Sequence, residues 1–230
     1  MRGVEQPIAY HPEGDVLTHT FHVLAEAQKI IKNRPERHDA ILALAALFHD
    51  TGKPHTVRPH PKYGYDCFFG HDEAGERIAL DTLAAWAIPG GIASRVADLV
   101  RHHMIPGGDV TERTCVKLIR KLGNTTEESL PLVERLFDLA LCDARGAMAV
   151  GENILTARRL FCEVRDNLLR AEEASSKRLL NGNDVMEILG IPPGREVGKI
   201  LDELDVAVGG GKLRGRDEAV EWLKNGRSAL

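Results

Sequence analysis

A histidine and an aspartate stand side by side at the end of an apolar segment of the sequence. His49 and Asp50 follow residues 41–48, which are all apolar and predict a buried helix. Burying two such polar side chains without partners is costly, so we expect a metal ion or other polar groups to meet them. Gly52 is expected to close this helix in a left-handed conformation, and Pro54 is expected to prevent it from resuming.

Two further ionisable residues share the apolar faces of predicted helices, where an apolar side chain would be less costly to bury. His19 lies on such a face within residues 16–31, and Asp143 lies on one within residues 130–148. Each of them alone is typical of a hydrogen-bonded residue in a protein core. Together with the adjacent pair they offer imidazole and carboxylate ligands from three helices, which suits a divalent metal ion. A carboxylate can also bridge two ions, which lie about 3.5–4 Å apart in such sites.

A metal site of this kind has a definite chemistry. It generates a nucleophile from bound water at neutral pH and takes up negative charge from a phosphoryl oxygen. Three cationic residues near the ligands in the sequence, Lys53, Arg58 and Arg145, are placed to contact such an anion. For Arg58, which falls in a predicted loop, a solvated position is at least as consistent with the sequence.

The elements that must position these residues are predicted to be helices. Apolar residues recur at three- and four-residue spacing along most of the chain, and no long stretch alternates as a strand would. Prolines and glycines within residues 55–70 predict a long loop, which in a compact domain is often functional. The fold class is therefore predicted to be all-α. The expected helices cover residues 16–31, 37–48, 68–87, 92–104, 114–122, 130–148, 153–180, 184–189, 195–204 and 217–224.

The composition is that of an ordinary globular chain of 230 residues, with 43% hydrophobic and 28% charged residues. The net charge of −4 argues against a protein that coats nucleic acid, and we expect no DNA partner. Aromatic residues make up only 5% of the chain, so surfaces for base stacking are not indicated. Four widely spaced cysteines, no signal peptide and no long apolar segment favour a cytoplasmic protein without a membrane partner.

The order of the candidate ligands resembles that of a known family. His19, the pair His49–Asp50 and Asp143 follow the H…HD…D order of the HD-domain metal-dependent phosphohydrolases. Residues 49–53, HDTGK, are similar to the HD-x-G-K signature of that family. The resemblance implies an HD-domain helical bundle and an enzyme that needs one or two divalent ions. Mg, Mn, Ni, Co and Fe are not distinguished by the sequence.

The chain resembles one branch of the family more closely still. This branch is the C-terminal HD portion of bacterial multifunctional CCA-adding tRNA nucleotidyltransferases. The resemblance extends over roughly residues 14–222 and includes a small helical C-terminal appendage. We therefore expect an HD domain at residues 1–174 and an appendage at residues 175–230, where the composition changes. The nucleotidyltransferase head of those enzymes has no counterpart in this sequence, so we do not expect CCA addition. The motifs that carry the resemblance lie at residues 14–20, 68–75, 99–104, 143–146, 181–186 and 189–198.

The resemblance implies hydrolysis of nucleotide phosphomonoesters or 2′,3′-cyclic phosphodiesters, with an RNA end among the substrates. It implies His19, His49, Asp50 and Asp143 as ligands of one ion. His71 and His103 would complete the shell of a second ion if one is present, and would otherwise contact the phosphate. Asp50 would orient or bridge the attacking water, and Lys53 would act with it in catalysis. The residues expected to contact substrate are Lys53, Arg58, His102 and Arg145.

Two other functions are compatible with the same residues. Some HD-fold proteins with six ligands are di-iron oxygenases, which would contain two irons and consume oxygen. A non-catalytic module that binds nucleotide or RNA would bind without turnover. The oligomeric state and the physiological substrate are not predicted by the sequence.

Overall fold

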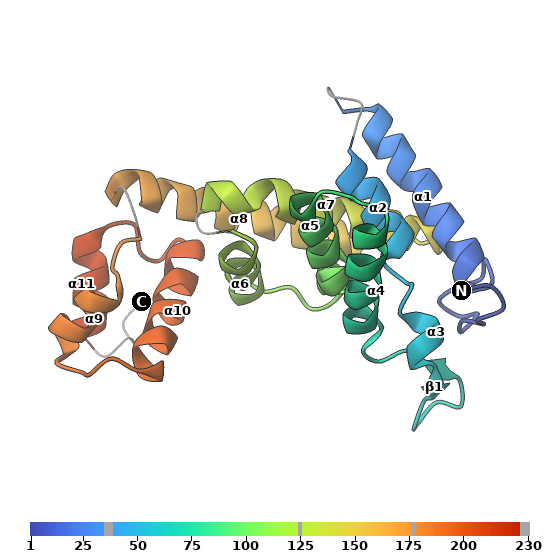
Figure 1. The fold of residues 1–230 in the computed structure, drawn as a ribbon. Coiled ribbons are helices and arrows are strands. Elements are labelled where there is room, and N and C mark those ends of the chain that lie inside the picture. The colour runs from blue at the N-terminus through green and yellow to red at the C-terminus, as the bar shows by residue number, and fades with distance from the viewer. Residues whose placement is uncertain (35–38, 124–125, 176–177, 226–230) are drawn as a thin grey trace. The chain divides into compact units, whose positions relative to one another are not determined.

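Helices form nearly all of the regular structure, which confirms the predicted all-α fold class. The structure is a computed structural model that describes residues 1–34, 39–123, 126–175 and 178–225 (Figure 1). Within these ranges no helix is long and apolar enough to cross a membrane. The helices are α1 (Val16–Lys32), α2 (Ala40–Phe48), α3 (Lys53–Thr56), α4 (His71–Ala85), α5 (Gly90–His102), the 3-10 turn η1 (Ile105–Gly107), α6 (Glu112–Leu122), α7 (Thr126–Gly146), α8 (Glu152–Ser175), α9 (Gly182–Leu189), α10 (Arg195–Gly209) and α11 (Arg216–Lys224).

A small sheet interrupts the helical pattern. Strand β1 (Arg58–Pro59) pairs with β2 (Asp66–Cys67) in antiparallel orientation, with Arg58 opposite Cys67. The sequence predicted a loop here, because strands of two residues are too short to show an alternating pattern. The pairing turns this part of the predicted loop into a hairpin, which we call the β1–β2 hairpin.

The contacts within the described residues divide the chain into two compact units. The N-terminal unit consists of Met1–Asp109 and Pro131–Thr156, and the C-terminal unit of Val110–Leu130 and Ala157–Leu230. Helices α7 and α8 each contribute residues to both units.

The domain boundary expected after residue 174 falls at the end of α8. Compact units are grouped by contacts, whereas the predicted domains followed composition and family resemblance. The assignment of residues 1–174 and 175–230 to two domains therefore stays a prediction.

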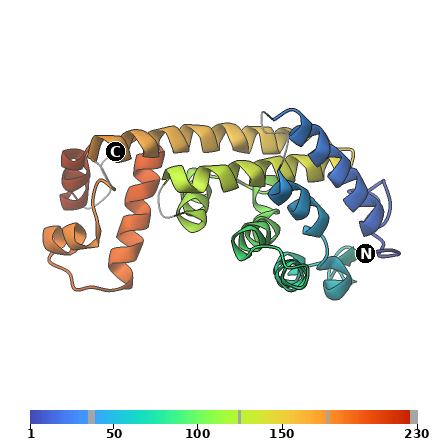
Figure 2. The same cartoon turned by 45° about the horizontal axis from the view of Figure 1, so that its top comes forward.

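The core of the N-terminal unit forms between α1, α2, α4 and α5. Helix α2 packs against α1 and α5, and α4 lies along α5, as Figures 1 and 2 show. The carboxylates of Asp15 and Asp39 cap the first turns of α1 and α2 by accepting backbone N–H groups at 2.9 and 3.0 Å. The predicted start of α2 at residue 37 lies outside the described residues. Fully buried side chains in this core include Val23, Leu42, Leu83, Val96 and Leu99.

Gly52 and Pro54 have roles other than those expected. Gly52 has φ −77°, which is right-handed, and Pro54 lies in the first turn of α3 instead of ending a helix. Close packing explains the glycine, because a Cβ at this position would overlap the backbone carbonyl of His71 and lie 2.7 Å from the Gly75 nitrogen. The glycine therefore lets the start of α4 approach the end of α2.

The C-terminal unit is held together by α10, which packs against α6 and α9. The predicted end of α10 at residue 204 is wrong, because the helix continues to Gly209. Asp205, in the part of α10 that was not predicted, is buried, and Arg120 Nε and Arg178 Nε lie 3.1 and 3.0 Å from its Oδ2. These two guanidinium partners let a carboxylate be buried within the last turns of α10.

Candidate metal centre

Five segments of the N-terminal unit bring the predicted ligands together. The imidazoles come from α1, from the end of α2, from the start of α4 and from the end of α5, and the second carboxylate comes from α7. The side chains that meet are His19, His49, Asp50, His71, His103 and Asp143.

The first group surrounds one oxygen of Asp50. His49 Nε2 lies 3.3 Å and His19 Nε2 lies 3.8 Å from Asp50 Oδ2. Asp143 Oδ1 lies 2.8 Å from His19 Nε2 and 3.8 Å from His49 Nε2. The two imidazoles and Asp50 are buried, while the side chain of Asp143 is 27% exposed. Four potential ligands thus converge from α1, α7 and the end of α2.

The second group faces the other oxygen of Asp50. His71 Nε2 and His103 Nε2 lie 3.6 and 3.9 Å from Asp50 Oδ1, and 3.2 Å from each other. Since its two oxygens face different pairs of imidazoles, Asp50 is placed as a carboxylate that bridges two metal ions would be.

Three of the imidazoles are held in the same way. The Nδ1–H groups of His49, His71 and His103 each donate to the backbone carbonyl three residues earlier, at 2.9, 2.8 and 2.7 Å. A bond of this kind fixes the tautomer and leaves the Nε2 lone pair available to a metal ion. The helical backbone therefore aims all three Nε2 atoms at Asp50.

His19 is held by a residue that the sequence did not single out. Its Nδ1 donates to Glu13 Oε1 at 2.6 Å, and His11 Nδ1 donates to the same oxygen at 2.9 Å. These residues lie before α1, where no periodicity distinguishes them. His11, Glu13 and His19 are also close enough to share an ion. Because Glu13 contacts Nδ1, the ring nitrogen that faces away from Asp50, we interpret Glu13 as orienting His19.

Lys53 supplies positive charge next to Asp50. Its Nζ lies 2.7 Å from Asp50 Oδ2 and donates to Gln6 Oε1 at 2.7 Å. The lysine side chain is buried, so its charge acts at short range with little screening by solvent. Gln6, like Glu13, belongs to the segment before α1 and was not predicted.

The histidines of the centre differ in how readily they take up a proton, which a metal ligand must not carry. Burial lowers the pKa of His103 to about 4 and also lowers the pKa of His71, so both are neutral at pH 7. Burial opposes ionisation of Asp50, but His49 and Lys53 outweigh it and hold the pKa of that carboxyl well below its usual range. Burial likewise works against charge on His49, and the nearby Asp50 carboxylate nevertheless raises the pKa of His49.

One buried atom at the centre lacks an ordinary partner. Among the described residues, His49 Nε2 has no hydrogen-bond partner although it is shielded from solvent, and it lies 3.3 Å from Asp50 Oδ2, whose charge is met by Lys53 Nζ at 2.7 Å. Buried polar atoms are nearly always satisfied in proteins, and a ligand is a common explanation where they are not. An imidazole nitrogen and a carboxylate oxygen that face each other fit a divalent metal ion.

A cavity of about 540 Å³ gives access to the centre. Asp50, Lys53, His71 and Asp143 line it on one side. Ligand sites in proteins have volumes of about 300–1,000 Å³, so the cavity has the size expected for a small substrate. The other lining residues are Pro7, Tyr10, His11, Tyr65, Asp66, Cys67, Phe68, Phe69, Gly70, Asp72 and Met104.

The three other predicted substrate contacts do not line this cavity. Arg58 is exposed on β1, where its guanidinium lies 5.2 Å from the ring centre of Phe69. His102 is buried beside His103, and Arg145 is exposed on α7. The roles predicted for these three residues stay predictions.

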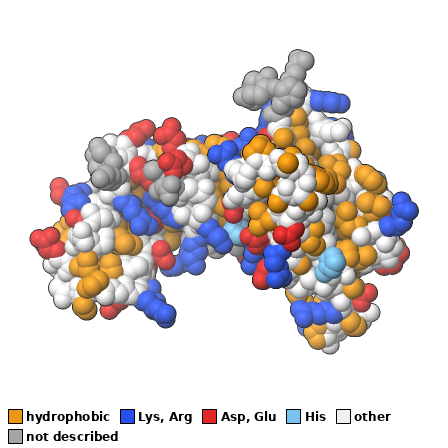
Figure 3. All heavy atoms as spheres, in the orientation of Figure 1, with side chains coloured by type: hydrophobic (Ala, Val, Ile, Leu, Met, Phe, Trp, Pro, Cys, Tyr) orange, Lys and Arg blue, Asp and Glu red, His pale blue; other side chains and the backbone are white. Residues whose placement is uncertain are grey.

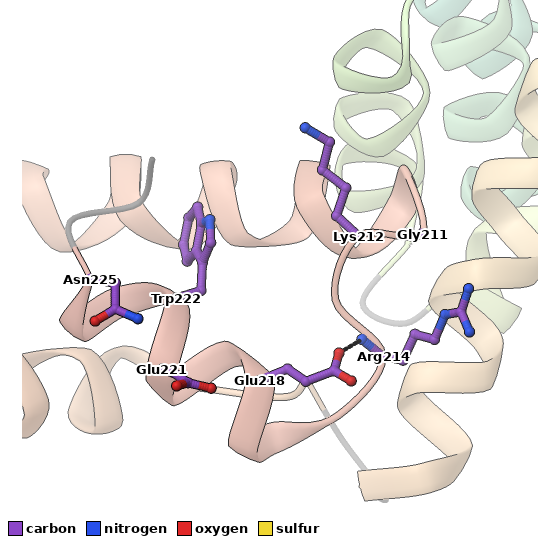
Figure 4. A pocket seen from close by; sticks show the side chains of 7 residues that line it. All are labelled: Gly211, Lys212, Arg214, Glu218, Glu221, Trp222 and Asn225. Atoms are coloured by element: carbon purple, nitrogen blue, oxygen red, sulfur yellow. Dashed lines mark hydrogen bonds between the residues drawn. The ribbon is translucent and has the colours of Figure 1, made fainter. Parts of the chain in front are cut away.

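The C-terminal unit also contains cavities, and their chemistry is different. One of about 400 Å³ is lined by residues 211–225, among them Lys212, Arg214, Glu221 and Trp222. Figure 4 shows these side chains and the hydrogen bond of 2.8 Å from the Arg214 backbone to Glu218. Within the described residues, every group of side chains close enough to share a metal ion lies in the N-terminal unit.

Comparison with known proteins agrees with the geometry. Residues 16–145 match the family described as HD domain. The A-adding tRNA nucleotidyltransferase of Deinococcus radiodurans is 32% identical over 215 residues, which are 91% of this chain and 46% of the relative. The CC-adding tRNA nucleotidyltransferase of Thermus thermophilus is 35% identical over 196 residues, 81% of this chain and 41% of the relative. The chain thus spans less than half the length of these relatives.

Proposed function

Because the chain belongs to the HD-domain family of metal-dependent phosphohydrolases, we propose that it hydrolyses phosphate esters of nucleotides with a divalent metal ion. The proposed substrates are phosphomonoesters and 2′,3′-cyclic phosphodiesters. An RNA end is included among them, because the relatives are named as tRNA nucleotidyltransferases.

The position of Asp50 carries this proposal. Its two oxygens face separate pairs of imidazoles at 3.3–3.9 Å, at the wall of a cavity that can admit a substrate. If Asp50 served only as a buried ion-pair partner of Lys53, it would need no second pair of histidines, His71 and His103, near its other oxygen. The arrangement supports a centre for one or two ions.

The side chains around a bound ion would each have a stated task. His19, His49, Asp50 and Asp143 would hold one ion, and His71 and His103 would complete the shell of a second. A divalent ion in such a site supplies a Lewis acid that activates water and takes up charge from a phosphoryl oxygen. Asp50 would orient the attacking water, since one of its oxygens faces each group.

Lys53 would act on the phosphoryl group as well as on Asp50. Its ammonium lines the cavity and lies 2.7 Å from Asp50 Oδ2. A buried cation there keeps the carboxylate ionised and attracts a substrate anion toward the water that attacks it. The loss of Lys53 would therefore weaken both substrate binding and the chemical step.

A di-iron oxygenase is the second candidate. The five candidate ligands around the shared Asp50 carboxylate favour it, because imidazole and carboxylate ligands also suit iron. The similarity to tRNA nucleotidyltransferases favours the phosphohydrolase. Two irons per chain with oxygen consumption would identify the oxygenase.

A turnover screen tests the proposal. Metal-stripped protein is reloaded separately with Mg²⁺, Mn²⁺, Co²⁺, Ni²⁺ or Fe²⁺ and given 2′-, 3′- and 5′-nucleotides, 2′,3′-cyclic nucleotides and bis-p-nitrophenyl phosphate. Three products are followed: phosphate from the monoesters, nucleoside monophosphate from the cyclic nucleotides, and p-nitrophenol from bis-p-nitrophenyl phosphate. Product formation that follows the metal, and that Asp50→Ala abolishes, would support a phosphohydrolase and name its ester class.

The matched control is Asp81→Ala, which removes an exposed carboxylate from α4 and should leave turnover unchanged. Protein that binds metal but hydrolyses none of these esters would contradict the proposal. Nucleotide binding without turnover would then favour the non-catalytic module.

A further inference from the structure

Aromatic side chains line the same cavity as the metal centre, and we call them the aromatic wall. Tyr65, Phe68 and Phe69 come from the β1–β2 hairpin and the segment after it, and Tyr10 comes from the segment before α1. The wall was not predicted, because the chain has few aromatic residues and Tyr10 is far from the others in the sequence. The fold gathers several of them at one place.

The hairpin presents its rings as an ordered cluster. Tyr63 and Tyr65 are stacked, with 5.8 Å between ring centres and 12° between ring planes. Tyr10 meets Tyr65 edge to face at 6.3 Å and 71°. Tyr10, Tyr63 and Phe69 are 63%, 55% and 57% exposed. More than half of each ring's surface is therefore open to a ligand.

Cations accompany the rings. Lys62 Nζ lies 5.0 Å from the ring centre of Tyr63, and Arg58 Cζ lies 5.2 Å from that of Phe69. Figure 3 shows hydrophobic side chains next to Lys or Arg side chains on the part of the surface that β1 occupies in Figure 1. Exposed rings with neighbouring cations are the combination by which proteins bind nucleotides of single strands.

Lys53 lies close both to the metal centre and to an aromatic ring of the cavity. Its Nζ lies 2.7 Å from Asp50 Oδ2 and 5.5 Å from the ring centre of Phe68. A ligand that reaches from the centre to the rings must therefore carry an anionic end and a flat apolar end. A nucleotide has both.

We propose that Tyr10, Tyr65 and Phe69 form a base subsite, in which the nucleobase of the substrate stacks while its phosphate lies at the metal centre. The inference rests on the proposed function and adds to it the place and the means of base recognition. Stacking uses the face of the base, which every base has, so the subsite accepts all four bases and binds purines more tightly because their ring area is larger.

A matched pair of ligands isolates the base. Adenosine 5′-monophosphate and ribose 5-phosphate share the sugar phosphate and differ in the adenine. Their binding to Mn²⁺-reloaded protein is measured by isothermal titration calorimetry, in which hydrolysis shows separately as continuing heat after each injection. We expect the nucleotide to bind at least tenfold more tightly than the sugar phosphate.

Single substitutions then test which rings cause the tighter binding of the nucleotide. Tyr10→Ala should weaken nucleotide binding about tenfold, equivalent to about 1.4 kcal/mol, and leave ribose 5-phosphate binding unchanged. Tyr10→Phe keeps the ring and should restore nucleotide affinity, while Tyr65→Ala gives a second removal of a ring. Phe21→Ala is the control, because Phe21 is 60% exposed on α1 and does not line the cavity.

The source of the nucleotide is tested with adenosine 3′-monophosphate and a six-nucleotide RNA that ends in the same 3′-phosphorylated adenosine. Tighter binding of the RNA identifies an RNA end, and equal binding identifies a free nucleotide; both results keep the subsite.

Three results would overturn the base subsite. They are equal affinity for the nucleotide and the sugar phosphate, absence of nucleotide binding, and unchanged nucleotide affinity in both Tyr10→Ala and Tyr65→Ala. Base-dependent binding without hydrolysis would leave the subsite standing and refute the phosphohydrolase alone.

Discussion

Asp50 is the residue on which the others converge, and the sequence identified most of its neighbours. His19, His49 and Asp143 were predicted from their helical phase, because a polar residue on an apolar face is visible in a sequence. Glu13 and Gln6 were not predicted, because they lie in an irregular segment where no periodicity indicates which side chains face the core. Assignment of the six ligands to metal stays a prediction.

Glu13→Ala tests whether a residue outside the ligand set controls metal binding. The substitution removes the acceptor of the 2.6 Å bond from His19 Nδ1, so the imidazole loses its fixed orientation. We expect metal affinity, measured by calorimetry with Mn²⁺, to fall about 10–100-fold. Glu13→Gln keeps an acceptor oxygen and should lose less, and Glu5→Ala, at an exposed carboxylate, should lose nothing. Equal affinity in Glu13→Ala and wild type would show that Glu13 does not orient His19.

His103 makes the stability of the metal-free protein depend on pH. Its pKa is about 4 when folded, against about 6.5 when unfolded, so the unfolded chain binds more protons between these values. The contribution of the neutral His103 side chain to the free energy of unfolding is therefore present above pH 6.5 and is lost as the pH falls toward 4. From pH 7 to pH 5 this removes about 2 kcal/mol of unfolding free energy.

Urea unfolding in the presence of a chelator measures this slope. His103→Asn, which cannot take up the proton, should reduce the loss between pH 7 and pH 5. His55→Asn, at an exposed histidine, should leave it as in wild type. The same slope in His103→Asn and wild type would assign the pH dependence to other groups.

At the scale of elements, the sequence predicted the helices well and the reasons for their ends less well. The starts of α1 and α10 were predicted correctly, because Asp15 is a strong N-cap and Gly194 precedes a clear apolar period. The hairpin was missed because its strands have two residues each. Gly52 was expected to adopt a left-handed conformation, and the structure shows instead a close approach between backbones.

Gly52→Ala tests that approach. The added methyl group overlaps the His71 carbonyl, so α4 must move away from the end of α2, and His71 moves with it. We expect a loss of about 1–3 kcal/mol in unfolding free energy, together with weaker metal binding. Gly90→Ala is the matched control, because a Cβ at Gly90 meets no atom within 4 Å. Unfolding curves and Mn²⁺ titrations of the two variants measure both effects. If the Gly52→Ala protein is as stable as Gly90→Ala, the close approach of Gly52 to the start of α4 is not needed for stability.

At the scale of the whole chain, the family and the fold class were both predicted and are confirmed. The order of the ligands His19, His49–Asp50 and Asp143 and a few short motifs were enough to predict the family. The aromatic wall could not be predicted, since it joins Tyr10 to a hairpin more than 50 residues later in the sequence. Composition alone argued against base stacking, whereas the placement of the rings supports the base subsite that we propose.

The central claim is that an ion held around Asp50 hydrolyses a nucleotide phosphate ester. Its most direct test titrates Mn²⁺ into metal-free protein and follows bound metal together with hydrolysis of 2′,3′-cyclic adenosine monophosphate and of adenosine 2′-monophosphate. We predict that hydrolysis of at least one of them rises in proportion to bound metal, and that Asp50→Ala loses both metal and activity. Wild-type protein that fills with metal and hydrolyses neither ester, or Asp50→Ala that remains fully active, would contradict the claim.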